Sequence, residues 1–383
     1  MLSKLRRTLT GIALTLPIFA AGCRDSGSKQ IVRSNIKSDE VIVFYPTYAR
    51  WSPGDKAWIC EVHGKVFEPE DDSRKRAAFL RFLQSSSEAL EETEASEFLD
   101  ERVRPFLVDN ERGKSVAVEI AAHQATVGES GPNGHFSGTV TLPSESGGDR
   151  KGETPSMREV RAILTDGDDR EFRGRVHLIP PTGLSVISDI DDTIKLSQVT
   201  DKKELMRNTF LREFRPVEGM PDLYHQLAKA GVAFHYVSGS PWQLFGPIDS
   251  WMAVAGIPKG TLHFKHFRLK DSSVFDLLSS QTGTKLAAIE PILHSFPDRR
   301  FILVGDTGEQ DPEIYAQLAR KYPDQIAAVY IRNATGEDPS SPRFEAAFGE
   351  LQKTRCAVFN EASEIKAPIE ALLKELDETQ FRH

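Results

Sequence analysis

From Leu184 onward the sequence alternates between short apolar runs and amphipathic segments, and this alternation constrains the fold more than any other feature. Runs typical of buried strands cover 184–188, 232–237, 301–304 and 326–331. Helical patterns lie between or after them, at 221–230, at 285–296 and from Asp311 onward. Strands that alternate with helices predict an α/β fold with a largely parallel, doubly wound sheet.

Polar and acidic residues gather where three of these strands end. The three clusters are Asp189-Ile190-Asp191-Asp192-Thr193, Ser238-Gly239-Ser240 and Gly305-Asp306-Thr307-Gly308-Glu309-Gln310-Asp311. One such cluster could simply cap a helix, because Asp and Ser often do so after strands. Ligands of open α/β sheets bind outside the carboxyl ends of the strands, so three clusters at one edge predict a ligand site.

The residue types in these clusters suit phosphoryl transfer. Carboxylates supply the hard oxygen ligands that Mg²⁺ prefers, and the cation separates a carboxylate from an anionic phosphate. An aspartate nucleophile can form an aspartyl-phosphate, and a second carboxyl group can move the proton. A hydroxyl and an ammonium group can hold the remaining phosphoryl oxygens. The sequence therefore indicates metal-assisted phosphate chemistry.

The motif strings also resemble a known family. They read "SVISDIDDTIK" at 185–195, "YVSGSPWQL" at 236–244 and "FILVGDTGEQDPEIY" at 301–315. The pattern is similar to the four motifs of the haloacid dehalogenase superfamily of phosphatases. The longer strings look like the actin-patch-protein type of Mg²⁺-dependent phosphatidate phosphatase, whose catalytic domain is similar to that of the lipins. This resemblance implies a haloacid-dehalogenase-like sheet, Mg²⁺ as cofactor, and hydrolysis of phosphatidate to diacylglycerol and phosphate through an aspartyl-phosphate.

The resemblance implies a role for each motif residue that catalyses the reaction. Asp189 is expected to be the nucleophile. Asp191 is expected to be the general acid and base, and its backbone carbonyl a metal ligand. Thr193 is expected to orient the loop and the acid, and Ser238 to bind a phosphoryl oxygen.

The same resemblance implies the phosphate-binding lysine and the remaining metal site. Lys285 matches the family's position for the lysine, with Lys265 and Lys270 as alternatives. Asp306 is expected to bind Mg²⁺ together with Asp189 and Asp191. Asp311 is expected to support the metal site, although an Asp before a Pro is also a good helix cap.

The part before the alternating pattern reads as β-rich. Short runs rich in Val, Ile and Phe lie at 41–44, 58–67, 116–120, 136–142, 160–164 and 175–179. A helix-prone segment at 73–101 interrupts them, 144–155 reads as a surface loop, and Pro180-Pro181 marks a hinge. We therefore expect a smaller, sandwich-like accessory domain over 40–180, a catalytic domain over 181–362 and a C-terminal helix within 363–383.

The first residues have the features of an export signal. Lys4, Arg6 and Arg7 precede an apolar stretch at 9–21, which is too short to span a bilayer. The stretch ends in Ala20-Ala21-Gly22-Cys23, which resembles a bacterial lipobox. Residues 1–23 are thus expected to direct export and membrane anchoring through Cys23, with 24–39 as a tether. An ordinary signal for periplasmic or secreted proteins, and no export at all, are the alternatives.

The net charge argues against one class of binding partner, and the two remaining cysteines have no predicted chemical role. The formal net charge of −8 gives no footprint for general nucleic-acid binding. A phospholipid substrate at a membrane surface is the expected partner, and protein partners stay open. Cys60 and Cys356 are expected to be small buried residues, with a disulfide between them left open.

The sequence leaves alternatives open for one basic segment, for the substrate and for catalysis itself. The basic segment 202–215 is either an amphipathic lid that meets anionic headgroups or an ordinary packed helix. The same mechanism would also serve an exported enzyme that acts on a soluble phosphomonoester, since pocket shape and not motif sets the substrate. A non-catalytic module that binds phosphatidate is the third alternative, against which stands the presence of both Asp189 and Asp191.

Overall fold

The structure is a computed structural model that describes residues 33–70, 73–84, 97–143, 150, 153–267, 282–351 and 353–380. The expected signal peptide at 1–23, with its Cys23, lies outside the described residues. So do Lys270, most of the expected tether and most of the expected loop at 144–155.

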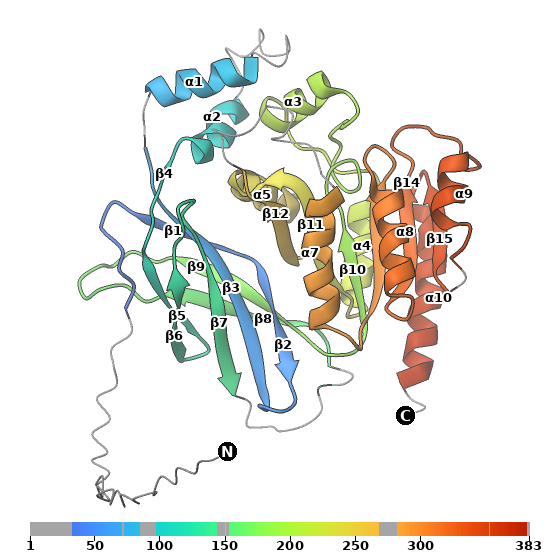
Figure 1. Ribbon diagram of the computed structural model, residues 1–383, viewed down its shortest axis with the longest axis horizontal. Helices are drawn as coiled ribbons and strands as arrows, with labels where there is room; N and C mark the ends of the chain where they lie inside the picture. The colour runs from blue at the N-terminus through green and yellow to red at the C-terminus, as the bar shows by residue number, and fades with distance from the viewer. Residues whose placement is uncertain are drawn as a thin grey trace, which may run out of the picture. The chain divides into compact units, whose positions relative to one another are not determined.

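A parallel sheet organises the second half of the chain (Figure 1). Its strands within the described residues are β10 (Leu184–Ser188), β11 (Ala233–Pro241), β12 (Thr261–Lys265), β13 (Arg300–Asp306), β14 (Ile326–Arg332) and β15 (Arg355–Phe359). They lie in the order β12-β11-β10-β13-β14-β15, and every neighbouring pair is parallel. This order confirms the predicted doubly wound fold. It also places a topological switch point between β10 and β13, where such folds bind their ligands.

Helices cover both faces of this sheet because its strands are apolar on both sides. Val186 and Ile302 point into the core beneath α4 (Met220–Lys229), α5 (Phe245–Val254) and α10 (Ala362–Gln380). Ile187 and Leu303 point into the core beneath α7 (Thr282–Ser295) and α8 (Asp311–Lys321). The short helix α9 (Pro342–Phe348) packs beside α8. The predicted C-terminal helix corresponds to α10, whose apolar side joins the first of these cores.

The first half forms a nine-stranded sheet around its own apolar core. Its strands within the described residues are β1 (Val41–Tyr45), β2 (Thr47–Ser52), β3 (Ala57–Glu68), β4 (Asp109–Asn110), β5 (Ser115–Ile120), β6 (His123–Glu129), β7 (His135–Pro143), β8 (Ser156–Ala162) and β9 (Arg173–Ile179). The sequence predicted a sandwich-like, β-rich domain here, and the structure confirms that this part is β-rich. The 12-residue strand β3 pairs with β1 and β2 along one edge and with β7 along the other, which joins all strands into one sheet.

The sheet curls until β6 approaches β7. A Cβ atom on Gly138 would lie 2.1 Å from the backbone oxygen of Val127, so only glycine permits this approach. The described end of the expected tether also packs on the sheet. Ser34 and Asn35 donate backbone hydrogen bonds of 2.8 Å to Ile163 and Ser115, and Ile36 is buried. The prediction of a free tether that extends to residue 39 is therefore wrong.

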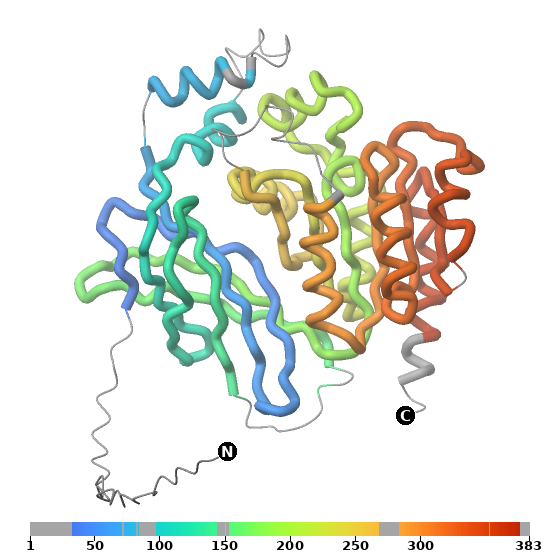
Figure 2. Tube along the Cα trace, in the orientation of Figure 1, coloured from blue at the N-terminus to red at the C-terminus, as the bar shows by residue number. Residues whose placement is uncertain are grey.

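Two helices inserted after β3 pack on the α/β part and not inside the β-rich core. These are α1 (Ser73–Gln84) and α2 (Glu97–Val103), which lie near α3 (Lys202–Phe210) in the trace (Figure 2). The rings of Phe79 and Phe210 lie 6.4 Å apart, and Arg102 donates to the backbone oxygen of Thr209 at 2.9 Å. Because the apolar side chains of α3 are buried in this contact, the contacts favour a packed helix over a lid with a free apolar face.

The expected hinge is held in place by one buried side chain. The Arg299 guanidinium donates to the backbone oxygens of Pro180 at 2.7 Å and Leu184 at 2.6 Å, and to Ser185 Oγ at 2.9 Å.

Cys60 and Cys356 are both free thiols. Among the described residues, no helix combines the length and apolar character that crossing a membrane requires.

Candidate active site

The first and third motifs leave the sheet side by side. Asp189 follows β10 directly, and its backbone N–H donates to Val304 of β13 at 2.9 Å. Asp306 is the last residue of β13, and both aspartates are buried. The two motifs therefore meet at the switch point between β10 and β13, as their positions after neighbouring strands predicted.

Three carboxylates form the centre of this site. Asp189, Asp306 and Asp311 each offer one oxygen, and these oxygens all lie within 4.8 Å of one another. Asp311 Oδ2 accepts a hydrogen bond from the backbone N–H of Asp306 at 3.2 Å, which fixes the loop between them. A Cβ atom on Gly305 would lie 2.3 Å from Asp311 Oδ2, so glycine is needed for this approach.

Lys285 of α7 supplies the positive charge of the cluster. Its Nζ lies 3.2 Å from Asp189 Oδ1 and 2.9 Å from Glu309 Oε2, and it also donates to Asp311. The structure thus brings into the site the lysine that the family resemblance implied. Of the two alternatives, Lys265 ends the outer strand β12 and Lys270 lies outside the described residues.

The charges of this cluster fit a divalent cation. Burial raises the pKa of Asp189, Lys285 opposes that rise, and Asp311 adds to it. Burial and Asp311 likewise raise the pKa of Asp306. Asp306 Oδ2 is buried and has no hydrogen-bond partner. The carboxylates thus outnumber the single ammonium group, and one carboxylate oxygen lacks a hydrogen bond. A hard cation such as Mg²⁺ would neutralise this excess negative charge.

The Asp191 carboxylate turns away from this cluster toward hydroxyl groups and a second lysine. It lies 2.7 Å from Lys195 Nζ and accepts hydrogen bonds of 3.1 Å from Ser238 and Ser240. Burial by itself would raise the pKa of Asp191, but Lys195 and hydrogen bonds from Ser197 and Ser238 lower it to about 2. The Asp191 side chain therefore does not face the carboxylate cluster. Of this residue, only the backbone carbonyl can take the expected role as a metal ligand.

The loop that carries both aspartates is held by its neighbours. Thr193 Oγ1 donates to Asp189 Oδ2 at 3.4 Å, which fits its expected orienting role. The Asp192 carboxylate accepts backbone hydrogen bonds of 2.7 to 2.8 Å from three residues, Ser197, Gln198 and Val199. Asp192 has a φ of 51°, a left-handed conformation that these bonds and Arg332 stabilise. Its side chain thus shapes the loop.

Sequence reasoning missed several residues of the site. Lys195, Ser197 and Ser240 surround Asp191, and Glu309 contacts Lys285. A signal was present for three of them, because Lys195, Ser240 and Glu309 lie inside the motif strings themselves. Ser197 had no such signal, since only the turn of the loop brings it to Asp191.

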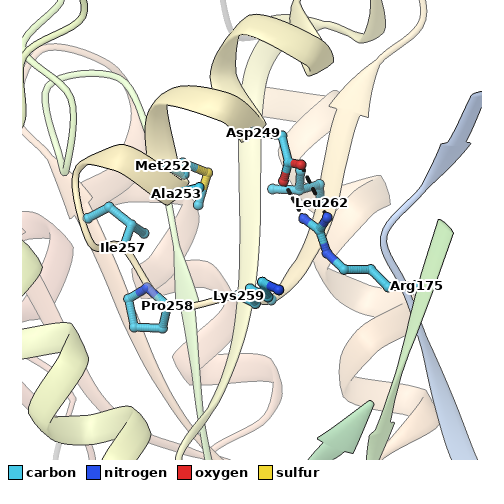
Figure 3. Close-up of a pocket in the computed structure, with 9 residues that line it drawn as sticks. Arg175, Asp249, Met252, Ala253, Ile257, Pro258, Lys259 and Leu262 are labelled. Carbon is cyan, nitrogen blue, oxygen red and sulfur yellow. Dashed lines mark hydrogen bonds and ion pairs between the residues drawn. The ribbon is translucent and has the colours of Figure 1, made fainter. Parts of the chain in front are cut away.

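A separate pocket of about 190 Å³ lies elsewhere on the α/β part (Figure 3). It is lined by Met252, Ile257 and Lys259, and by an ion pair in which Arg175 of β9 lies 3.1 Å from Asp249 of α5. The pocket opens beside the start of β12, whereas the motif residues follow the ends of the strands. It is therefore distinct from the carboxylate cluster.

Comparison with known proteins agrees with this geometry. Residues 184–333 match the family model described as phosphatidate phosphatase APP1, catalytic domain. The chain is 38% identical over 169 residues to phosphatidate phosphatase APP1 of Saccharomyces cerevisiae, and 27% identical over 187 residues to an uncharacterized protein of Schizosaccharomyces pombe. The matches cover 42% and 46% of this chain, but only 28% and 30% of those relatives.

A solved phosphoserine phosphatase overlaps 47% of this chain and 96% of its own, at 13% identity and a TM-score of 0.31. The strand order and the acidic residues at the switch point agree with the haloacid-dehalogenase-like sheet that the motif strings imply. The segment at 184–333, which holds the carboxylate cluster and Lys285, is similar in sequence to the catalytic domain of phosphatidate phosphatase APP1.

Proposed function

We propose that this protein is a Mg²⁺-dependent phosphatidate phosphatase that releases diacylglycerol and phosphate. The observation that carries the proposal is the convergence of Asp189, Asp306 and Asp311 around Lys285 at the switch point of the sheet. This convergence lies within the family segment at 184–333. The substrate class comes from the name of the yeast relative, of which the chain matches less than a third, and is part of the proposal.

Asp189 is the proposed nucleophile because it stands at the end of β10 with the Lys285 ammonium beside it. One of its oxygens attacks the phosphorus atom, and the bond from phosphorus to the lipid oxygen breaks. Lys285 holds negative charge at the phosphoryl group, and Ser238 offers its hydroxyl to a phosphoryl oxygen. When bound, Mg²⁺ would offset the repulsion between the phosphate and the carboxylate, with Asp189, Asp306 and Asp311 as its acidic neighbours.

Asp191 is the proposed proton carrier. Its low pKa keeps the resting carboxylate ionised, which suits the second step, in which it takes a proton from the attacking water. Water then displaces Asp189 from phosphorus and releases phosphate. For the first step, an approaching phosphate dianion would raise the pKa of Asp191, so that it carries a proton to the leaving diacylglycerol oxygen.

Phosphate release from phosphatidate in mixed micelles, with and without Mg²⁺, tests the proposal. Wild type should require Mg²⁺, and Asp189→Asn should lose at least about 10³-fold in kcat. Asp222→Asn, at an exposed position of α4, is the matched control and should keep its activity. Full activity of Asp189→Asn would remove the mechanism, and activity on a soluble phosphomonoester alone would overturn the lipid substrate.

We further propose that Cys23 anchors the enzyme at the membrane that holds its substrate. The support is the lipobox-like string that ends at Cys23. Fatty-acid labelling of the full chain expressed in bacteria should mark wild type and leave Cys23→Ser unlabelled. Equal labelling of the two proteins, or none of wild type, would overturn this anchor.

A further inference from the structure

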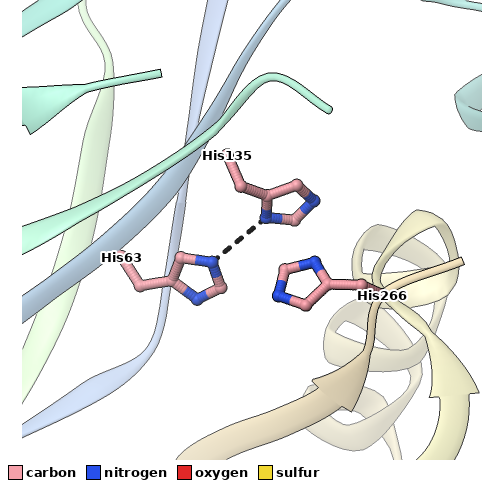
Figure 4. Close-up of side chains that lie close together, drawn as sticks. All are labelled: His63, His135 and His266. Atoms are coloured by element: carbon pink, nitrogen blue, oxygen red, sulfur yellow. Dashed lines mark hydrogen bonds between the residues drawn. The ribbon is translucent and has the colours of Figure 1, made fainter. Parts of the chain in front are cut away.

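Three histidines from distant parts of the chain meet outside the carboxylate cluster (Figure 4). His63 lies in β3, His135 begins β7, and His266 follows β12 at the end of the outer strand of the α/β sheet. Each offers one ring nitrogen, and these nitrogens all lie within 4.8 Å of one another. The rings of His135 and His266 lie 4.5 Å apart and edge to face.

The nitrogen–nitrogen distance of one hydrogen-bonded pair is close to that in a shared metal ligand set. His63 Nε2 and His135 Nδ1 lie 3.1 Å apart. Two imidazole nitrogens that bind one tetrahedral Zn²⁺ at about 2.0–2.1 Å are separated by about 3.3 Å. The pair therefore needs only a small adjustment to bind a metal ion, and His266 faces it as a third ligand.

The surroundings favour neutral imidazole, which is the form that binds metal. Burial lowers the pKa of His63 to about 3 and that of His135 to about 2. Aromatic rings flank the cluster: Tyr45 lies 4.9 Å and Trp242 also 4.9 Å from the ring of His63. Such an apolar shell limits the access of water to a metal site.

We propose that His63, His135 and His266 form a binding site for a transition-metal ion of the Zn²⁺ class, separate from the Mg²⁺ site. Imidazole ligands select such ions, whereas the carboxylates of the active site suit Mg²⁺. Two ligands come from the β-rich sheet and one from the α/β part, so the ion ties the two together. Trp242 directly follows β11, whose end carries Ser238, and the site therefore lies near the residue proposed to bind a phosphoryl oxygen.

Zn²⁺ titration of the full chain tests this proposal by calorimetry. The protein is freed of metal with a chelator and then saturated with Mg²⁺, so that the carboxylates are occupied. Wild type and Asp306→Asn should both bind one equivalent of Zn²⁺. His266→Ala should weaken binding by more than the roughly 10- to 100-fold that loss of an outer-shell partner costs. His266 is exposed, so its loss should leave the metal-free melting temperature unchanged.

His123→Ala is the matched control, because His123 is an exposed histidine of β6 outside the cluster, and it should bind Zn²⁺ like wild type. Added Zn²⁺ should raise the melting temperature of wild type and His123→Ala but not of His266→Ala. Absence of Zn²⁺ binding by wild type would overturn the site. The site would also be overturned if His63→Ala and His266→Ala both bound Zn²⁺ like wild type. The same holds if Asp306→Asn lost its one equivalent of Zn²⁺.

Discussion

Lys195 Nζ lies 2.7 Å from the Asp191 carboxylate, four residues earlier on the loop that follows β10. Lys195 is buried, and its ammonium also lies 5.0 Å from the centre of the Phe214 ring of the segment after α3. The candidate site thus contains two carboxylate–lysine pairs, since Lys285 contacts Asp189. This pairing gives the two motif aspartates different electrostatic environments and, in the proposed mechanism, different tasks.

Replacing the partner of Asp191 should change the pH dependence of catalysis. In Lys195→Met the pKa of Asp191 should rise from about 2, because burial then acts without the opposing ammonium. We expect the acidic limb of the profile of kcat/KM to move to higher pH and activity at neutral pH to fall about 10- to 100-fold. Lys229→Met, at the exposed end of α4, is the control. An acidic limb at the same pH in both variants would contradict this role of Lys195.

Neutralising one carboxylate of the cluster should stabilise the metal-free protein. The pKa values of Asp189, Asp306 and Asp311 are all raised, so each ionised group opposes folding as the pH rises above the unfolded value of about 4. Metal-free Asp306→Asn should melt above metal-free wild type at pH 8, and Mg²⁺ should raise the melting temperature of wild type but not that of Asp306→Asn. Asp222→Asn should respond as wild type does. An equal Mg²⁺ shift in Asp306→Asn would argue against a cation at this cluster.

A single methyl group at Gly305 should disrupt the site. The added Cβ would lie 2.3 Å from Asp311 Oδ2, so Asp311 must move and release Lys285 and the backbone of Asp306. We expect Gly305→Ala to lose at least about 10²-fold in activity, since small displacements at a reacting centre are costly. Gly246→Ala is the control, because its Cβ would meet no atom within 4 Å. Wild-type activity in Gly305→Ala would show that the position of Asp311 is not needed.

Buried histidines should destabilise the fold in acid. Burial lowers the pKa of His177 and that of His263 to about 4, while the unfolded chain protonates near 6.5. Stability from each group is therefore present above about pH 6.5 and is lost as the pH falls toward 4, by about 3 kcal/mol at most. Urea unfolding between pH 7 and 4 should show a smaller loss of stability in His177→Gln than in wild type. The exposed control His225→Gln should lose as much stability as wild type. An equal loss of stability in all three proteins would show that His177 does not contribute to acid destabilisation.

The sequence predicted the elements that have strong local signals. The apolar runs at 184–188 and 301–304 became β10 and β13. A helix, α8, starts at Asp311-Pro312, although Gln310 and not Asp311 is its N-cap, so Asp311 does not cap it as the helix-start pattern indicated. Strand β6 was missed, because its sequence HQATVGE is mostly exposed and lacks an apolar pattern. The direction of the Asp191 side chain was also not predicted, because Ser238 and Ser240 reach it from the end of β11, far from Asp191 in sequence.

The sequence by itself determined the parallel sheet and the edge at which the motifs gather, because strand periodicity and strand-end residues are local properties of the chain. Only the tertiary structure decided which charges meet. It buried Lys285 among three carboxylates, turned Asp191 toward Lys195, and packed α1 and α2 on α3. It also brought together His63, His135 and His266. Apart from the pair of Asp191 and Lys195, these contacts join residues far apart in sequence, and packing around the cores fixes them where no local pattern can.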